Sequence, residues 1–136
     1  MKSAEAITYL RSFIGPEQLQ VLISNCRGEE RQYFCQTLLD LAERIKGMPK
    51  TYDTDGQGAK AVVYLHYFKG SADWFITEKD MDQHGQHQAF GLADLCHDGS
   101  GGEMGYISIE ELKQANVEID LHWTPKTLEA VRKNRS

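Results

Sequence analysis

The spacing of apolar residues changes near the middle of the chain, from a helical period in the first 50 residues to an alternating period after residue 59. In the first part, apolar side chains recur every three or four residues, which is typical of amphipathic helices. We expect Ser3 to cap the first helix and Pro16 to open the second, and we expect Cys35 to lie in the buried stripe of the third. The predicted helices cover about 3–13, 16–25 and 29–46.

The second part alternates between apolar and polar residues, as strands with one buried face do. Ser108 and Glu111 have the spacing of a capping box, which predicts a short helix as far as about Gln114. Thr124 followed by Pro125 predicts the start of a closing helix. The predicted strands cover about 60–68, 73–78, 88–95 and 103–109, with a fifth, edge-like strand over 117–121.

These patterns predict an α+β protein in which N-terminal helices pack on a mostly antiparallel, four- to five-stranded sheet, with short C-terminal helices. We expect a single domain over 1–136, with a helical part (1–50) and a sheet-rich part (59–136). The segment between them is rich in turn-forming residues and is the best candidate for a hinge. Phe34, Leu38 and Leu41 are expected to cover one face of the sheet.

Composition and charge exclude some classes of function. The 136 residues are 40% hydrophobic, which suits a globular domain, and the apolar runs are too short to span a membrane. The first residues lack an apolar leader, which favours a cytoplasmic location. The net charge is −5, and the stretch from Ile76 to Leu121 carries ten acidic and two basic residues. That half is therefore not expected to bind nucleic acid, which requires clustered Lys and Arg.

Cysteines and histidines offer a metal site only superficially. Cys26, Cys35 and Cys96 form no even disulfide framework and no C-x-x-C pair, so we expect reduced thiols. His84 and His87 lie near Cys96, but zinc requires four converging ligands, so we predict no metal. The glycine-rich segment 98–105 lacks the Lys and the following helix of a phosphate-binding loop, so we predict no cofactor.

The predicted strands hold many aromatic residues beside acidic ones. If the helices cover only one face of the sheet, aromatic side chains on the other face would form a surface for a partner. Packing within the core is the alternative for the same residues, Trp74 above all. The candidate partner-binding residues are Trp74, Glu78, Glu103, Tyr106 and Glu110.

Three blocks of sequence carry a family resemblance, and a shorter fourth block closes it. They are Ala72–Asp80, Ala89–Leu95, Glu103–Leu112 and Asp120–Pro125. With these blocks in this order, residues 61–130 resemble a bacterial family named domain of unknown function 2958. Its members are typically short proteins or modules carried on plasmids, phages and other mobile elements. The resemblance implies a bacterial accessory protein and no particular activity, and it leaves the N-terminal helices outside.

The leading hypothesis is a small, non-catalytic accessory module that binds another protein, in an unknown biological process and with an open oligomeric state. One alternative is a small hydrolase-type enzyme that uses His66, Glu78 and Asp94. Another is an acidic DNA mimic that inhibits host defence, which the acidic half and the mobile-element context would suit. Such mimics usually carry denser acidity than this chain.

Overall fold

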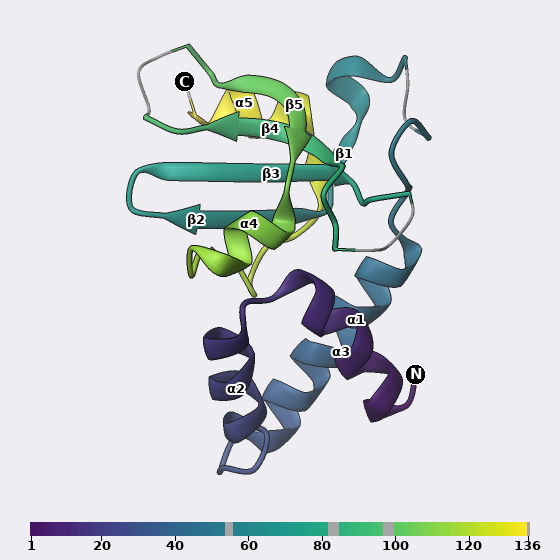
Figure 1. Ribbon diagram of the computed structural model, residues 1–136, viewed down its shortest axis with the longest axis vertical. Coiled ribbons are helices and arrows are strands. Elements are labelled where there is room, and N and C mark those ends of the chain that lie inside the picture. Colours follow the sequence, from purple (N-terminus) through teal and green to yellow (C-terminus); the bar gives the residue numbers. More distant parts are fainter. Residues whose placement is uncertain (54–55, 82–84, 97–99, 136) are drawn as a thin grey trace.

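The computed structural model describes residues 1–53, 56–81, 85–96 and 100–135, and it places the N-terminal helices at one end and the sheet at the other (Figure 1). This arrangement confirms the predicted α+β class. The helices are α1 (Ser3–Phe13), α2 (Pro16–Asn25), α3 (Arg31–Gly47), α4 (Ile109–Gln114) and α5 (Leu128–Arg135), with a short 3₁₀ turn at Gly58–Lys60.

The main sheet has five antiparallel strands in the order β5-β4-β3-β2-β6, so β5 and β6 form its two edges. Its strands are β2 (Leu65–Lys69), β3 (Ala72–Glu78), β4 (Ala89–Asp94), β5 (Glu103–Ile107) and β6 (Glu118–Ile119). A separate two-stranded sheet pairs β1 (Val62–Val63) with β7 (Lys126–Thr127). The strand predicted over 60–68 is therefore divided at Tyr64, because its first residues leave the main sheet to pair with β7.

The face of the sheet toward the N-terminal helices holds the larger part of the core. Leu65, Tyr67 and Ile76 join the buried residues of α1 and α3 in one continuous cluster. The hydroxyl of Tyr67 donates to the carbonyl oxygen of Phe13, which ties β2 to the end of α1. Leu41 belongs to the same cluster, so α3 covers this face as its apolar pattern predicts.

The opposite face of the sheet is also covered. Phe75 and Leu92 lie in a second buried cluster with Leu128 and Val131 of α5, and Figure 1 shows α5 behind the sheet. Because α5 packs over the centre of this face, the face does not form the open aromatic surface that the sequence made conceivable.

The helix starts are partly as predicted. The side chain of Ser108 accepts a hydrogen bond from the backbone N–H of Glu111 at 3.3 Å, which confirms the predicted cap of α4. Pro16 is the first residue of α2, as expected. Ser3 is not a cap but the first residue inside α1, because the preceding Lys2 occupies the capping position without a side-chain hydrogen bond.

The prediction for the closing helix is wrong by three residues. Thr124 and Pro125 do not start it, because the next two residues pair with β1 as strand β7. The helix begins at Leu128, and the hydroxyl oxygen of Thr127 accepts a hydrogen bond from the N–H of Ala130 at 3.2 Å. No helix in the described part of the chain has both the length and the apolar character that a membrane span requires.

Candidate functional site

The five candidate partner-binding residues lie in different environments. Trp74 is half-buried and packs against the core cluster on the helix side. Glu78 is only 2% exposed, at the end of β3. Glu110 is on α4, where its carboxylate accepts from the ammonium of Lys113 at 3.4 Å. Trp74 and Glu78 are thus four positions apart on β3, and Glu110 lies on a separate element.

Glu103 and Tyr106 lie together on β5, an edge of the main sheet. Tyr106 is 56% exposed, and Met104, two positions before it on the same face of the strand, is 38% exposed. The hydroxyl of Tyr106 lies 2.7 Å from that of Tyr52, which is itself 52% exposed. Beneath them, the ring of Phe90 meets that of Tyr106 edge to face at a centroid distance of 5.6 Å. We call Tyr52, Met104 and Tyr106 the edge patch.

The two edges of the sheet differ. At β6, the side-chain amide of Gln18 bonds both backbone groups of Ile119, donating to its oxygen and accepting from its N–H, each at 2.9 Å. Gln18 therefore takes the place that another strand would occupy beside Ile119. At β5, no strand among the described residues pairs with the outer side.

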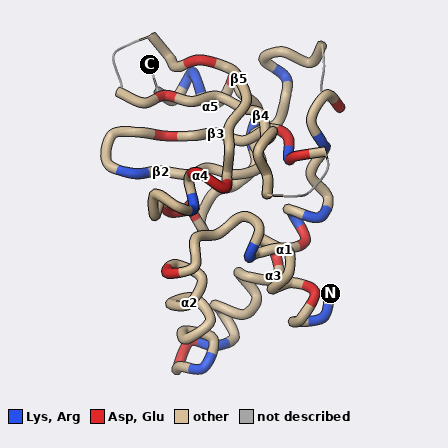
Figure 2. The backbone as a smooth tube through the Cα atoms, viewed as in Figure 1, with Lys and Arg blue, Asp and Glu red and all other residues tan. Residues whose placement is uncertain are grey.

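The sheet has an acidic end next to β5. Asp73 and Asp94 are directly opposite each other on β3 and β4, and Glu103 is opposite Ala93. Figure 2 shows an acidic position on each of these three strands toward the same end of the sheet. A basic group is therefore favoured near the start of β5, and a phosphate is disfavoured.

His66 has two carboxylate partners that the sequence analysis did not identify. Its Nε2 lies 2.7 Å from an oxygen of Asp73, and its Nδ1 lies 3.1 Å from an oxygen of Asp120. The imidazole is stacked on Phe75, with a centroid distance of 4.8 Å and an angle of 8° between the rings. Through its two nitrogens, the ring links β2 to the start of β3 and to the segment after β6.

The trio suggested for a hydrolase is not assembled. Asp94 pairs with Asp73 near the start of β3, whereas Glu78 is the last residue of that strand. Five residues of extended strand separate Asp73 from Glu78 by about 17 Å. His66 is within hydrogen-bonding distance of Asp73 and Asp120 instead.

The three cysteines are free thiols. Burial, and secondarily a hydrogen bond from Cys35, raises the pKa of the Cys26 thiol to about 11, which keeps it protonated. Cys35 is exposed, not in the buried stripe of α3 as predicted, because the helix turns that position toward solvent. His84 lies outside the described residues. In the part of the chain that the structure covers, no three His, Cys, Asp or Glu side chains gather as a metal site.

The match to known families covers more than half of the chain. A family model described as "Protein of unknown function (DUF2958)" matches residues 35–127. The chain belongs to this family. The DUF2958 match begins inside α3, so it includes much of the helix that the sequence blocks had left outside. It also spans β2 to β6 and the whole edge patch. No curated protein and no solved structure matches the sequence.

Sequence alternation could identify Glu103 and Tyr106, because a strand signal was clear there. It could not identify Asp73 and Asp120 as partners of His66. The first is a cross-strand neighbour whose pairing depends on the register of a tight turn, and the second is 54 residues away in sequence. A search of the sequence for acidic residues close to the turn after His66 would have found Asp73 but not Asp120.

Proposed function

We propose that this protein is a non-catalytic binding module that takes an extended segment of a partner protein as an additional strand along β5. The observation that carries the proposal is the contrast between the two edges of the sheet. Gln18 occupies the outer side of β6, whereas β5 ends the sheet beside exposed apolar side chains. An added strand would gain main-chain hydrogen bonds from β5 and side-chain contacts from the edge patch.

The composition of β5 supports this role. Edge strands are commonly protected from pairing by Lys, by Pro or by a bulge. The sequence of β5, Glu-Met-Gly-Tyr-Ile, contains neither Lys nor Pro, and its pairing with β4 is regular. A Cβ placed on Gly105 would meet nothing within 4 Å, so a partner side chain has room beside it. An open and regular edge favours pairing with another chain.

The expected partner segment has alternating apolar residues and a Lys or Arg near Glu103. Its apolar side chains would lie against Met104 and Tyr106, which face the same side of the sheet. Its basic residue would meet the acidic end of the sheet, where Asp94 lies close to Glu103. The same acidity makes nucleic acid an unsuitable partner for this edge.

The proposal can be tested with displayed random peptides selected on the full chain. We expect enrichment of extended, alternating sequences with one basic residue, and protection of the amides of residues 103–107 from hydrogen exchange on binding. Met104→Lys should abolish binding, because it adds a charge to the edge. Val21→Lys is the matched control, since Val21 is also an exposed apolar residue but is on α2.

Equal binding by the wild type and the Met104→Lys variant would contradict the proposal. Peptides that leave the β5 amides unprotected would contradict it as well. A concentration-dependent dimer that buries β5 would show that the partner is a second copy of this chain instead.

A further inference from the structure

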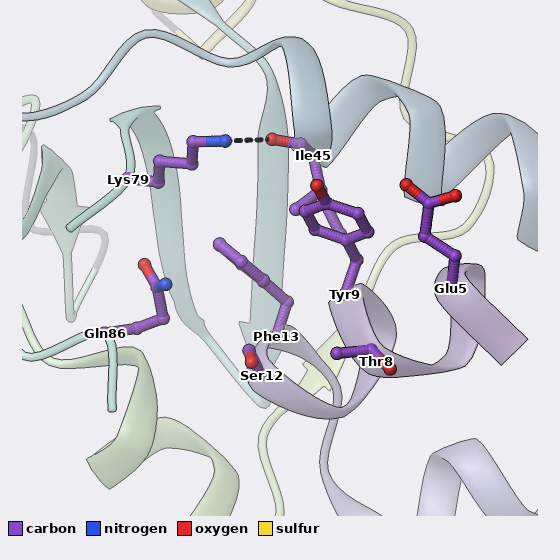
Figure 3. A pocket seen from close by; sticks show the side chains of 8 residues that line it. All are labelled: Glu5, Thr8, Tyr9, Ser12, Phe13, Ile45, Lys79 and Gln86. Carbon is purple, nitrogen blue, oxygen red and sulfur yellow. Dashed lines mark hydrogen bonds between the residues drawn. The ribbon is translucent and has the colours of Figure 1, made fainter. Parts of the chain in front are cut away.

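A cavity of about 330 Å³ lies between α1, the end of α3 and the loop before β4. Figure 3 shows that Lys79 and Gln86 border it from one side, while Ser12 and Phe13 border it from α1. Glu5 is at the far end, beyond Tyr9. The described residues that border the cavity include none from β5 or the edge patch, so a ligand bound in it can be tested separately from the proposed function.

Gln86 carries a buried amide with unused donors. Its side chain is part of a residue only 1% exposed, and its Oε1 accepts from the N–H of Asp80 at 2.9 Å. Among the described residues, none accepts a hydrogen bond from its Nε2. A buried N–H group without an acceptor is destabilising and is rare in proteins. The amide therefore requires an acceptor from within the cavity.

Lys79 carries a buried ammonium that also requires a further hydrogen-bond acceptor. The residue is 4% exposed, and its Nζ donates to the carbonyl oxygens of Ile45 at 2.8 Å and Lys46 at 3.0 Å. These bonds cap the end of α3, but an ammonium has three N–H groups. In the described part of the chain, no carboxylate pairs with it. Burial, and secondarily the charge of Lys50, lowers the pKa of Lys79, as incomplete neutralisation would.

The backbone of Gln86 is held in a strained conformation. Gln86 has a φ of 49°, a left-handed value that is unusual for a residue with a side chain. The carboxylate of Asp80 accepts from the N–H groups of His87 at 2.9 Å and Gln88 at 3.1 Å, which fixes this turn. Strain of this kind persists where the surroundings determine it, and it is frequent at ligand sites.

We propose that this cavity binds a small monocarboxylate with an apolar body. The carboxylate accepts from the ammonium of Lys79 and the amide of Gln86, and the apolar body lies against Phe13 and Ile45. Because a water molecule occupies about 30 Å³ of liquid, the volume suits a ligand of roughly ten non-hydrogen atoms. The carboxylate of Glu5 at the far end disfavours a second negative charge on the ligand.

The test is a titration of the full chain with benzoate, monitored by the ¹H–¹⁵N signal of the Gln86 side-chain amide and by the melting temperature. We expect benzoate to shift that signal in a saturable way and to raise the melting temperature, and benzyl alcohol, its neutral analogue, to do neither. Lys79→Met should weaken benzoate binding about ten-fold or more, since it removes the charge and keeps the stem. Lys60→Met is the matched control, because Lys60 is exposed and is not among the residues that border the cavity.

If Lys79→Met does not fold, Ser12→Ala gives a second readout, since Ser12 borders the cavity and has no hydrogen-bond partner through its hydroxyl in the described residues. We expect that variant to bind benzoate several-fold more weakly. Equal effects of benzoate and benzyl alcohol would overturn the proposal. Benzoate binding of unchanged strength in both the Lys79→Met and the Ser12→Ala variants would overturn it as well.

Discussion

Two glycines that face each other across β4 and β5 should respond in opposite ways to the same substitution. Gly91 and Gly105 are paired residues, and neither has a positive φ. A Cβ on Gly91 would lie 2.0 Å from the carbonyl oxygen of Phe75 and 3.0 Å from the Cα of Ile76. A Cβ on Gly105 would meet nothing within 4 Å. The pair thus isolates the effect of space from that of backbone conformation.

The expected magnitudes depend on these distances. In Gly91→Ala, the strands β3 and β4 must separate by about 1 Å or more, because nothing flexible can move aside. Overpacking of this kind costs about 1–3 kcal/mol, and each ladder hydrogen bond lost costs about 1 kcal/mol more. We therefore expect a loss of roughly 3–5 kcal/mol, a large part of a typical total of about 5–15 kcal/mol. In Gly105→Ala, the stiffer unfolded chain should leave stability unchanged or raise it by up to about 1 kcal/mol.

Urea denaturation monitored by circular dichroism would measure both variants against the wild type. We expect the midpoint of Gly91→Ala to fall clearly, with a melting temperature lower by about 10 °C or more, and that of Gly105→Ala to stay or rise. Similar midpoints for the two variants would refute the close approach of β3 to Gly91, and with it the strand register at this point.

Three further outcomes are expected. Trp74→Ala should lower the free energy of unfolding by about 2–4 kcal/mol, because the indole ring packs on the core. A loss well below about 1 kcal/mol, measured by urea denaturation, would show that the ring is not part of the core. A truncated chain that starts at Ala59 loses the helical cover of the sheet and should melt far below the full chain, whereas equal melting temperatures would mean that the helices fold as a separate unit. Burial raises the pKa of Tyr67 well above its usual value of 10.0, so its contribution is complete below about pH 10 and is lost as the pH rises further. Replacing it with Phe should make the fall in stability above about pH 10 shallower in equilibrium unfolding.

Short sequence motifs predicted the helix starts that depend only on neighbouring residues. The cap at Ser108 and the proline at the start of α2 involve residues a few positions apart, so their spacing was sufficient. Thr124 and Pro125 have an equally good local signal, but it was overridden by the pairing of β7 with β1, about 60 residues earlier. Propensity is a weak determinant wherever distant segments compete for the same residues.

The candidate sites divide in the same way. The alternation of apolar and polar residues was sufficient to predict that Tyr106 lies on a strand with an exposed face. The role of Gln18 at β6 was not, because its hydrogen bonds reach across 101 positions of sequence. The approach of Gln86 and Lys79 to one cavity likewise depends on how α1 and α3 pack against the sheet.

The pairing of β1 with β7 also has a consequence for biosynthesis. Val62 can pair with Thr127 only after all strands of the main sheet have left the ribosome, and the same holds for the hydrogen bond from the indole N–H of Trp123 to the carbonyl oxygen of Val63. Until then, Phe75 and Leu92 have no cover from α5. A nascent chain interrupted between β6 and α5 would therefore expose an apolar sheet face that chaperones and proteases can recognise.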